Sequence, residues 1–527
     1  MGFPINTFSI TGAIRWTKYR RPYSPAIWPK RAVHSRLPVL SLFLFLLVAC
    51  LQSCSQDKPS GDQASLLPEQ TENRNAQPNT EQALIRIQAE LDKLEQAEWL
   101  QQASWSLSVI DQDGQPLIER DSRRSLLPAS TLKLLTAGRS LASLGASQVF
   151  ETAVFTDGII SNDTLRGNLY LQGSSDPDFG LTDIQVLAEA LEAWEIKVLD
   201  GDLITGKSVL GPRWAPGGWE WDDLGNYYAP FCGAFCLDEN VLKLSFRTPA
   251  QTGKATTLIK MEPQIEGLEV ENHVITGEPG SGDQAWVYAA PGSTRISVHG
   301  SLPPGQSSFR IKAAIPDPDL AASQQLLKAC GWELLGQIRT RQGLPAEKRP
   351  LASVESSPLT DMLEEMLAQS INGHAEHLLR HSGREVHGGD PEEAAESMLD
   401  WLTELGADRE GCRIVDGSGL SRSNLVSTHF MASSAHLMLE QSWGDILFQI
   451  LPENGRDGTL RRVLPYSAGR IRAKTGTLDG VRGYAGYLIG ESGGRYAFCL
   501  LVNHHEGGSS AARSRLDPLL GSLIGLP

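Results

Sequence analysis

Positive charge, metal-ligand clusters and long apolar runs are all scarce in this sequence. It has 47 lysines and arginines against 62 aspartates and glutamates, a formal net charge of −15. A protein that follows a phosphate backbone needs clustered basic side chains, so this balance argues against nucleic acid as a partner. Cysteines and histidines nowhere have metal-ligand spacing, and the adjacent pair His504-His505 would diverge on a strand. We therefore expect no metal and no cofactor.

The apolar run of residues 37–49 is shorter than the roughly 20 residues needed to span a bilayer. Preceded by Arg36, it fits the apolar region of a secretory signal peptide. Residues 47–50, LVAC, resemble a bacterial lipobox, in which the cysteine becomes the lipidated first residue; Cys54 is the weaker second candidate. A plain signal peptide or an uncleaved anchor is the alternative. We expect export to the periplasm or cell envelope, with lipidation at Cys50 anchoring the chain to a membrane.

Two of the remaining cysteines, Cys232 and Cys236, lie close together in FCGAFC. They are able to form a disulfide in an oxidising compartment, but pairing does not follow from sequence. Cys499, in the apolar run YAFCLLV, is expected to be a buried thiol.

Composition divides the chain into segments. Residues 1–50 are expected to be a lipoprotein-type signal peptide, and residues 51–82, rich in Gln, Asn, Ser and Pro, a disordered linker. Residues 83–155 and 346–527 are expected to form one split catalytic domain around an insertion, residues 156–345. The insertion consists of short alternating runs between Gly and Pro turns, which predicts β-rich accessory domains.

Periodicity locates the main elements outside the insertion. Residues 105–119 alternate around Asp113-Gly114 and predict a β-hairpin. Two further strands are expected around the Gly-rich turn near residue 493. Helical patterns occupy residues 83–100, 356–372, 391–406 and 510–524, with another helix starting near Ala375 and one inside the insertion near residues 183–194. The coarse picture is an α/β (α+β) fold, a sheet flanked by helices and interrupted by β-rich domains.

The stretch PASTLKLLTAG, residues 128–138, places Ser130 and Lys133 one turn apart at a helix start. Free N–H groups at a helix N-terminus suit a developing oxyanion. A lysine enclosed by leucines loses solvation of its charged form, so its pKa falls and it can act as a base. The alternative is an ordinary capped helix whose lysine stem lies along an apolar surface.

Two later stretches complete a set. AQSINGHAEH places Ser370 and Asn372 where a helix ends; a hydroxyl there can relay protons and an amide can hold a carbonyl. RIRAKTGTLDG places Lys474, Thr475, Gly476 and Thr477 on a strand, where ammonium and hydroxyl groups can bind a carboxylate and the glycine lets a ligand approach. Each triplet alone is equally compatible with an ordinary loop or strand end.

Ser-x-x-Lys, Ser-x-Asn and Lys-Thr-Gly occur in this order in the penicillin-recognising serine acyl-transferases. From about residue 104 onward the chain resembles the class C low-molecular-mass penicillin-binding proteins, the D-alanyl-D-alanine carboxypeptidases/endopeptidases. The long gap between the first two motifs is also typical of that family. So are three further stretches, LQGSSDPDF, PGGWEWDDLGNYYAP and VDGSGLSRSN. Ile371, where an Asp is common, and the two cysteines of FCGAFC depart from it.

The resemblance implies a transpeptidase-like fold, with an antiparallel sheet flanked by helices, and acyl transfer at a D-Ala-D-Ala terminus. Ser130 would be the nucleophile, Lys133 the general base, and Ser370 the group that passes a proton to the leaving amine. Asn372 would orient the acyl chain. Lys474, Thr475 and Thr477 would hold the carboxylate around Gly476, and the N–H groups of Ser130 and Thr477 would form the oxyanion hole.

The implied partners are peptidoglycan stem peptides and covalently bound β-lactams; the oligomeric state stays open. A serine β-lactamase shares the three motifs, but no Glu-x-x-Leu-Asn element lies between Asn372 and Lys474. A non-catalytic wall-binding lipoprotein is a second alternative. Asp416 and Ser418, in VDGSGLSRSN, could support the site, but a Gly-rich turn is the simpler interpretation and they are left out of the predicted site.

Overall fold

The computed structural model describes residues 19–20 and 77–527. The expected signal peptide, the lipidation site Cys50 and the linker up to residue 76 lie outside the described residues, apart from Tyr19–Arg20 (β1). Within the described part of the chain, no helix is both long and apolar enough to cross a membrane.

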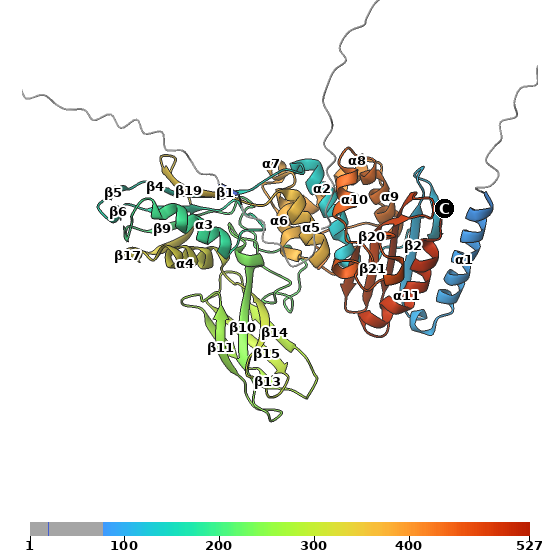
Figure 1. Cartoon of the computed structure of the whole chain (residues 1–527), viewed down its shortest axis with the longest axis horizontal. Helices are drawn as coiled ribbons and strands as arrows, with labels where there is room; N and C mark the ends of the chain where they lie inside the picture. Colours follow the sequence, from blue (N-terminus) through green and yellow to red (C-terminus); the bar gives the residue numbers. More distant parts are fainter. Residues whose placement is uncertain (1–18, 21–76) are drawn as a thin grey trace, which may run out of the picture. The chain divides into compact units, whose positions relative to one another are not determined.

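A five-stranded antiparallel sheet forms the centre of the motif-bearing part of the chain (Figure 1). Its strands, in spatial order, are β20 (Ile471–Leu478), β21 (Val481–Ile489), β22 (Arg495–Asn503), β2 (Ser104–Ile110) and β3 (Pro116–Arg120). The expected hairpin is confirmed by the pairing of β2 with β3, and the two expected C-terminal strands by the pairing of β21 with β22.

Side chains alternate between two apolar layers along β22. Phe498 and Leu500 point into one core, and Cys499 and Leu501 into the other. Cys499 is a fully buried thiol, as expected. Because both faces of the sheet are covered at β22, residues 496–502 of this strand are apolar and buried throughout, without the polar alternate residues of a half-exposed strand.

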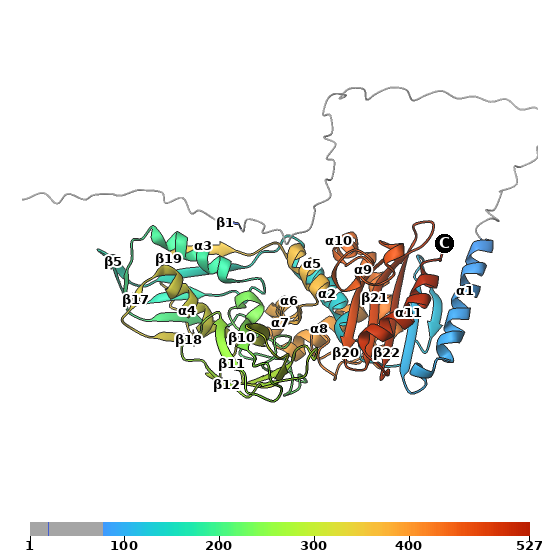
Figure 2. The ribbon, with the colours of Figure 1, turned by 60° about the horizontal axis from the view of Figure 1, so that its bottom comes forward.

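Two helices cover the first face of the sheet, α1 (Gln77–Glu95) and α11 (Ser509–Leu523) (Figure 2). Ile87 and Leu91 of α1 and Leu520 of α11 belong to one apolar cluster with the strands. Helix α1 begins before residue 83, so the end of the expected linker is helical instead. Composition alone does not distinguish the polar start of an amphipathic helix from a linker.

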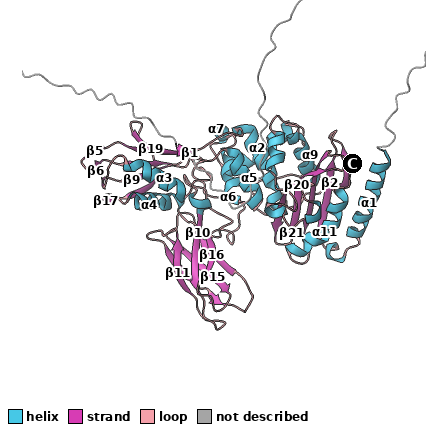
Figure 3. Cartoon of the chain, in the orientation of Figure 1, coloured by secondary structure: helices cyan, strands magenta, loops and turns pink. Residues whose placement is uncertain are grey.

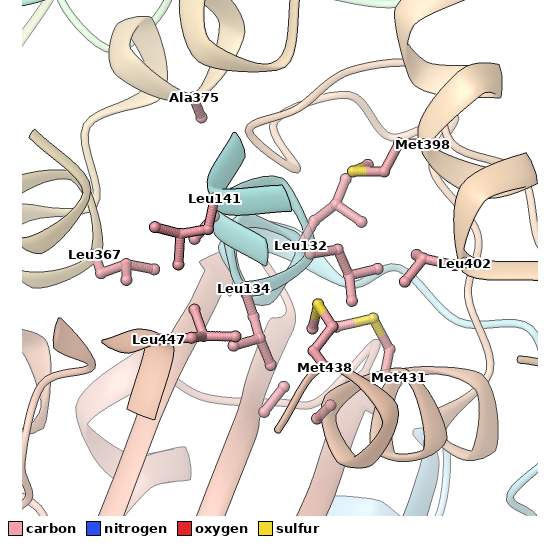
Figure 4. Close-up of a cluster of buried hydrophobic side chains, with 14 of the residues drawn as sticks. Leu132, Leu134, Leu141, Leu367, Ala375, Met398, Leu402, Met431, Met438 and Leu447 are labelled. Atoms are coloured by element: carbon pink, nitrogen blue, oxygen red, sulfur yellow. The ribbon is translucent and has the colours of Figure 1, made fainter. Parts of the chain in front are cut away.

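A second helical layer covers the other face (Figure 3). Helix α2 (Lys133–Leu144) runs through its centre, and Leu134 and Leu141 contact side chains from several neighbouring helices (Figure 4). The neighbours are α5 (Leu359–Gln369), α6 (Asn372–His381), α8 (Pro391–Glu404), α9 (Thr428–Leu439) and α10 (Gly444–Ile450), and the short helix α7 (Arg384–His387) lies beside α8. Removing a leucine from such a core typically costs about 2–5 kcal/mol, so the position of α2 is firmly set.

The intervening chain contributes to four further sheets, of six, three, four and four strands, and has a separate apolar core. It leaves through β4 (Glu151–Thr156) and returns through β19 (Arg349–Glu355), which pair antiparallel. The expectation of β-rich inserted structure is confirmed, while the exact limits at residues 156 and 345 stay a prediction. The other strands are β5 (Ile159–Ser161), β6 (Thr164–Arg166), β7 (Leu169–Gln172), β8 (Val198–Asp200), β9 (Leu203–Gly206), β10 (Val241–Arg247), β11 (Thr257–Glu262), β12 (Glu269–Asn272), β13 (Ile275–Thr276), β14 (Gln284–Ala289), β15 (Arg295–Leu302), β16 (Phe309–Ala314), β17 (Glu333–Leu334) and β18 (Ile338–Gln342).

The insertion contains two helices rather than one. The expected helix is α3 (Leu181–Glu192); the second is α4 (Pro318–Cys330). Its signals were present in the sequence, because Asp317 caps it by accepting the N–H of Leu320 at 3.0 Å and Gly331 ends it in the left-handed conformation.

Candidate active site

Ser130 lies in a short 3₁₀ turn, η2 (Ala129–Leu132), that leads directly into α2. The hydroxyl of Thr131 donates to the carbonyl of Pro128 at 2.7 Å and closes this turn. Ala129, just before the serine, has a positive φ of 47°. Such a conformation is costly for alanine and persists only where surrounding contacts enforce it. Ser130 is half-buried, so its hydroxyl is presented at the end of an otherwise buried helix.

The ammonium or amine of Lys133 has three oxygen neighbours. Its Nζ lies 3.0 Å from Ser130 Oγ, 2.6 Å from Asn372 Oδ1 and 2.7 Å from the carbonyl oxygen of Ser418. The side chain is fully buried, and this burial lowers its pKa to about 7, although the carboxylates of Asp416 and Glu376 act in the opposite direction. A lysine held at this distance and with this pKa can accept the serine proton near neutral pH.

The turn between α5 and α6 brings the second motif to Lys133. Ser370 ends α5 with a φ of 63°, and Asn372 is the first residue of α6. The amide of Asn372 accepts from Lys133 and donates through Nδ2 to the backbone carbonyl of Tyr228 at 2.7 Å. Within residues 77–527, no hydrogen bond joins the Ser370 hydroxyl to Ser130 or Lys133. The structure therefore places Asn372 in direct contact with the lysine and Ser370 at the adjoining turn.

Strand β20 lies directly against the serine turn because Gly476 has no side chain. A Cβ atom at Gly476 would lie 2.6 Å from the carbonyl oxygen of Pro128 and 3.0 Å from Thr131 Cγ2. Its cross-strand partner is Gly483, where a Cβ would also lie 3.0 Å from Thr131 Cγ2. This glycine pair lets η2 contact the sheet backbone. We call residues 474–477 of β20 the strand wall of the site.

The strand wall concentrates positive charge. Lys474 is fully buried, and burial lowers its pKa well below the usual range, with further lowering from Lys133 and Arg482. Its Nζ donates to the carbonyl of Thr475 at 2.8 Å. Arg482 donates to the hydroxyl of Thr477 at 2.9 Å. An arriving carboxylate would relieve this unfavourable arrangement of cations, so the strand wall is suited to bind one.

Arg482 is a site residue that the motif analysis missed. It is the cross-strand partner of Thr477 in the pairing of β20 with β21. The only local signal was its position in GVRG, immediately after the turn that follows the third motif.

The opposite side of the serine is formed by residues 416–421, which we call the loop wall. Asp416 is fully buried, and its two oxygens accept from the N–H groups of Gly419 at 2.7 Å and Ser421 at 2.8 Å. The side chain of Asn424 also donates to it at 2.8 Å. A Cβ at Gly419, which has a φ of 79°, would lie 1.9 Å from the carbonyl oxygen of Ala129. The sequence left open whether Asp416 and Ser418 support the site or belong to a simple Gly-rich turn; in the structure the loop wall contacts the turn that holds Ser130.

A second buried carboxyl group supports the loop wall from α6. Glu376 Oε1 accepts from the N–H groups of Gly417 at 2.8 Å and Ser418 at 3.0 Å. Burial and the nearby Asp416 raise the pKa of Glu376 well above its usual range. The carbonyl of that same Ser418 accepts from Lys133. Glu376 therefore acts on the lysine through the loop backbone, and it was missed because neither its type nor its spacing belongs to the three motifs.

The inserted segment also reaches the loop wall. Trp219 is buried, and its indole N–H donates to Asp416 Oδ2 at 2.9 Å. Together with the bond from Asn372 to Tyr228, this gives the insertion two polar contacts with residues that surround Lys133.

Potential metal ligands gather elsewhere. Asp178, Glu365 and His374 each place one ligand atom within 4.8 Å of the others. They come from three separate segments, so sequence spacing did not show them, and they make none of the contacts of Ser130 or Lys133. The expectation that catalysis needs no metal stays a prediction.

The two cysteines of FCGAFC are free, buried thiols in the structure. Burial raises the pKa of Cys232 and raises that of Cys236 well above its usual range.

His505 is also buried and contacts Trp99 edge to face, at a centroid distance of 6.3 Å.

The chain that carries this serine, buried lysine, amide and cationic strand is similar to known proteins. The D-Ala-D-Ala carboxypeptidase 3 (S13) family matches the chain over residues 87–523. The chain belongs to this family. As an S13 enzyme it is a serine peptidase of the D-Ala-D-Ala carboxypeptidase type.

The similarity to individual relatives extends over most of the length of this chain. The D-alanyl-D-alanine carboxypeptidase of Actinomadura sp. (strain R39) is 28% identical over 445 residues, covering 80% of this chain and 82% of that protein. Among solved structures, penicillin binding protein 4 from Haemophilus influenzae is 25% identical with a TM-score of 0.71, covering 80% of this chain and 97% of that one. A second structure of that protein, complexed with a β-lactam, is 24% identical with a TM-score of 0.66, covering 81% and 96%.

These similarities confirm the resemblance to class C penicillin-binding proteins and the expected fold class. The S13 match extends across the insertion as well as the motif-bearing segments, so the insertion belongs to the family's own architecture.

Proposed function

We propose that this S13 enzyme cleaves D-Ala-D-Ala termini through an acyl-enzyme formed on Ser130, with Lys133 as general base. The observation that carries the proposal is the 3.0 Å contact between Ser130 Oγ and the Nζ of a fully buried lysine. Burial lowers the pKa of that lysine to about 7, so a substantial fraction is neutral at physiological pH.

In the proposed reaction, Ser130 Oγ attacks the carbonyl carbon of the penultimate D-Ala and gives its proton to Lys133. The backbone N–H groups of Ser130 and Thr477 bind the oxyanion, a contribution of roughly 3–4 kcal/mol per donor. When the C–N bond breaks, the proton passes to the departing D-Ala amine through the Ser370 hydroxyl. Water then attacks the ester, and the serine recovers its proton.

The strand wall and Asn372 orient the substrate. Lys474, Thr475 and Thr477 bind the terminal carboxylate, while Gly476 leaves room for the peptide backbone. Asn372 holds the acyl chain through the amide that also contacts Lys133. The cations Lys474 and Arg482 support this assignment, because a free carboxylate is the group that distinguishes a chain end from a peptide interior.

Labelled penicillin tests the nucleophile. We expect a covalent adduct that maps to Ser130 in the wild-type chain and disappears in Ser130→Ala. An adduct that survives this substitution would contradict the proposal, and rapid release of hydrolysed drug would favour a β-lactamase instead. Covalent inhibition by β-lactams is part of the proposal and is supported by the S13 assignment and the three motifs.

Cleavage of D-Ala–diaminopimelate cross-links is the second proposed activity. It uses the same attack on a D-Ala carbonyl, with an amine of the neighbouring stem as leaving group. Purified cross-linked muropeptides distinguish the two activities, since an endopeptidase releases monomers and a strict carboxypeptidase releases only D-Ala.

We also propose that the enzyme works in the cell envelope, anchored through a lipid on Cys50. The support is the sequence of residues 36–50 and a wall polymer as substrate. Metabolic labelling with a fatty-acid analogue tests this: label is expected on the mature chain and lost in Cys50→Ala. Label that moves to Cys54, or labelling unaffected by Cys50→Ala, would contradict the assignment.

A further inference from the structure

The sheet that contains β14 and β15 carries aromatic side chains on its outward face. Val287 and Ala289 of β14 point into the core of the insertion, so the alternate residues Trp286 and Tyr288 point away from it. His299 of β15 lies on the same face, directly across from Trp286 in the antiparallel pairing. Trp286 remains 44% exposed, although aromatic rings of this size are normally covered.

These rings form a continuous series with one residue from a neighbouring loop. Trp221, 61% exposed, stacks on Tyr288 with centroids 6.2 Å apart and planes 12° apart. Tyr288 contacts His299 at 5.6 Å, and His299 stacks on Trp286 at 6.1 Å and 14°. We call Trp221, Tyr288, His299 and Trp286 the aromatic row. Contiguous exposed aromatic surface of this kind marks an interaction site.

One short loop connects the aromatic row to the active site. Gly225 packs so closely on β14 that a Cβ there would lie 2.5 Å from the N atom of Ala289. Asn226 Oδ1 accepts the N–H of Val287 at 3.0 Å. Two residues later, the carbonyl of Tyr228 accepts from Asn372. The row is therefore fixed relative to the amide that contacts Lys133, rather than borne on a loosely attached domain.

The polar groups around the rings indicate the kind of ligand. The hydroxyl of Tyr288 lies 3.3 Å from Asp222 Oδ1, and Ser297 Oγ lies 2.8 Å from His299 Nε2. A pyranose presents C–H groups on its faces and hydroxyl or amide groups around its edge, so it stacks on a flat ring while its edge meets such neighbours. The net charge of −15 argues against a nucleic acid on this surface.

We propose that the aromatic row binds pyranose rings of the glycan strand to which the stem peptides are attached. This inference rests on the proposed function, since it assumes that the peptide substrate is presented on a polysaccharide. Holding the glycan would raise the local concentration of stem peptides at Ser130 without any new contact to the scissile bond.

The test measures binding to glycan and cleavage of peptide separately. The full chain carrying Ser130→Ala is sedimented with insoluble sacculi from which an amidase has removed all stem peptides. We expect Trp221→Ala plus Trp286→Ala in that background to weaken sedimentation at least tenfold. Trp221→Phe plus Trp286→Phe should retain most of the binding, because the rings remain. Ile159→Ala, which removes a 75% exposed apolar side chain from another sheet, is the matched control.

Failure of this inference is distinguishable from failure of the proposed function. With Ser130 intact, the double alanine variant is expected to cleave a soluble D-Ala-D-Ala peptide at the wild-type rate, which also shows that it folds. Equal binding of peptide-free glycan by wild type and double variant would overturn the inference, as would binding that requires intact stem peptides. Neither result bears on the penicillin adduct at Ser130, which tests the proposed function.

Discussion

The two walls around Ser130 are built in opposite ways. The strand wall belongs to a regular antiparallel ladder, and glycines on two adjacent strands let it approach the serine turn. The loop wall has little regular structure and is held by two buried carboxyl groups, Asp416 and Glu376, that accept backbone N–H groups.

The difference predicts how substitutions affect each wall. A ladder distributes its hydrogen bonds over many residues, so one changed side chain leaves the backbone in place. A loop held by a buried carboxylate depends on that one group, because its loss leaves several buried N–H groups without acceptors. We therefore expect substitutions in the strand wall to affect substrate binding, and those in the loop wall to affect Ser130 and Lys133 themselves.

The largest effect is expected for Gly419→Ala. Its φ of 79° disfavours a side chain, and the new Cβ would lie 1.9 Å from the carbonyl oxygen of Ala129. A displacement of the serine turn by about 1 Å is expected to slow acylation by about 100-fold, and the free energy of unfolding should fall by about 2–4 kcal/mol. Penicillin acylation and urea unfolding measure the two. The control is Gly476→Ala in the strand wall, with its Cβ 2.6 Å from Pro128 O and a smaller expected loss. The reverse ranking would contradict the comparison.

The pH dependence of acylation comes next. Because burial lowers the pKa of Lys133 to about 7 and the neutral amine is the base, acylation should fall below that pH and level off above it. The expected decrease is about tenfold per pH unit. Asp416→Asn removes a carboxylate that raises the pKa of Lys133, so the midpoint should move to lower pH. Stopped-flow acylation with a chromogenic β-lactam measures it, and an unmoved or raised midpoint in Asp416→Asn would refute the electrostatic argument.

Lys474→Met tests the strand wall. Loss of a charge-assisted hydrogen bond to the carboxylate is expected to cost about 1.5–3 kcal/mol, or roughly 10- to 150-fold in kcat/KM. A matched peptide with an amidated C-terminus, already a poor substrate, should lose much less. Unfolding in urea should show little loss of stability, because the buried ammonium is replaced by an apolar side chain. Equal losses for both peptides would show that Lys474 does not bind the carboxylate.

Glu376 separates hydrogen bonding from charge in the loop wall. Glu376→Gln keeps an acceptor for the N–H groups of Gly417 and Ser418 and removes only the ability to carry a charge, which burial and Asp416 already disfavour by raising the pKa of the native group. We expect it to change acylation by less than about threefold, which corresponds to under 1 kcal/mol. Glu376→Ala leaves both donors buried and unpaired and should lower the free energy of unfolding by about 2 kcal/mol or more. Similar behaviour of the two variants, by urea unfolding and acylation rate, would exclude this role.

Among the substitutions that remove a hydrogen bond, the smallest effect is expected for Trp219→Phe, which removes the bond to Asp416 and keeps an aromatic ring. A single neutral-to-charged hydrogen bond contributes about 1.5–3 kcal/mol at most, and the four other donors to Asp416 remain. Acylation should slow only a few-fold, with a small decrease in thermal stability. A loss as large as that of Gly419→Ala would mean that the insertion, rather than the loop wall, positions the serine.

The same contrast separates what the sequence predicted from what it did not. Ser130, Lys133, Asn372 and Lys474 were predicted from three short motifs in a fixed order and from the family resemblance that these motifs carry, since no single motif decided the prediction. The central sheet followed from strand alternation and turn residues. Glu376 was missed because the N–H groups that it accepts, those of Gly417 and Ser418, lie 41 and 42 residues further along the chain. Asp416 and Arg482 bond mostly to near neighbours, but their place at the site depends on how the loop wall and strand β21 pack against the serine turn, which the sequence does not record.

The missed helix α4 has a different cause. Its cap Asp317, first-turn Pro318 and terminal Gly331 were all visible, but the surrounding strand pattern was extended over it. By contrast, the contact between Asn372 and Tyr228 could not be anticipated, since it depends on how the insertion packs against the motif-bearing part of the chain.

That single amide has a practical consequence for anyone who would simplify the protein. An inserted region is an obvious candidate for deletion when a shorter enzyme is wanted. Here Asn372 is bonded at one end to Lys133 and at the other to the backbone of the insertion. Excision would leave the amide free to rotate and would strip Asp416 of its indole donor. We therefore expect a chain shortened in this way to lose activity, because the insertion holds two of the residues that surround Lys133.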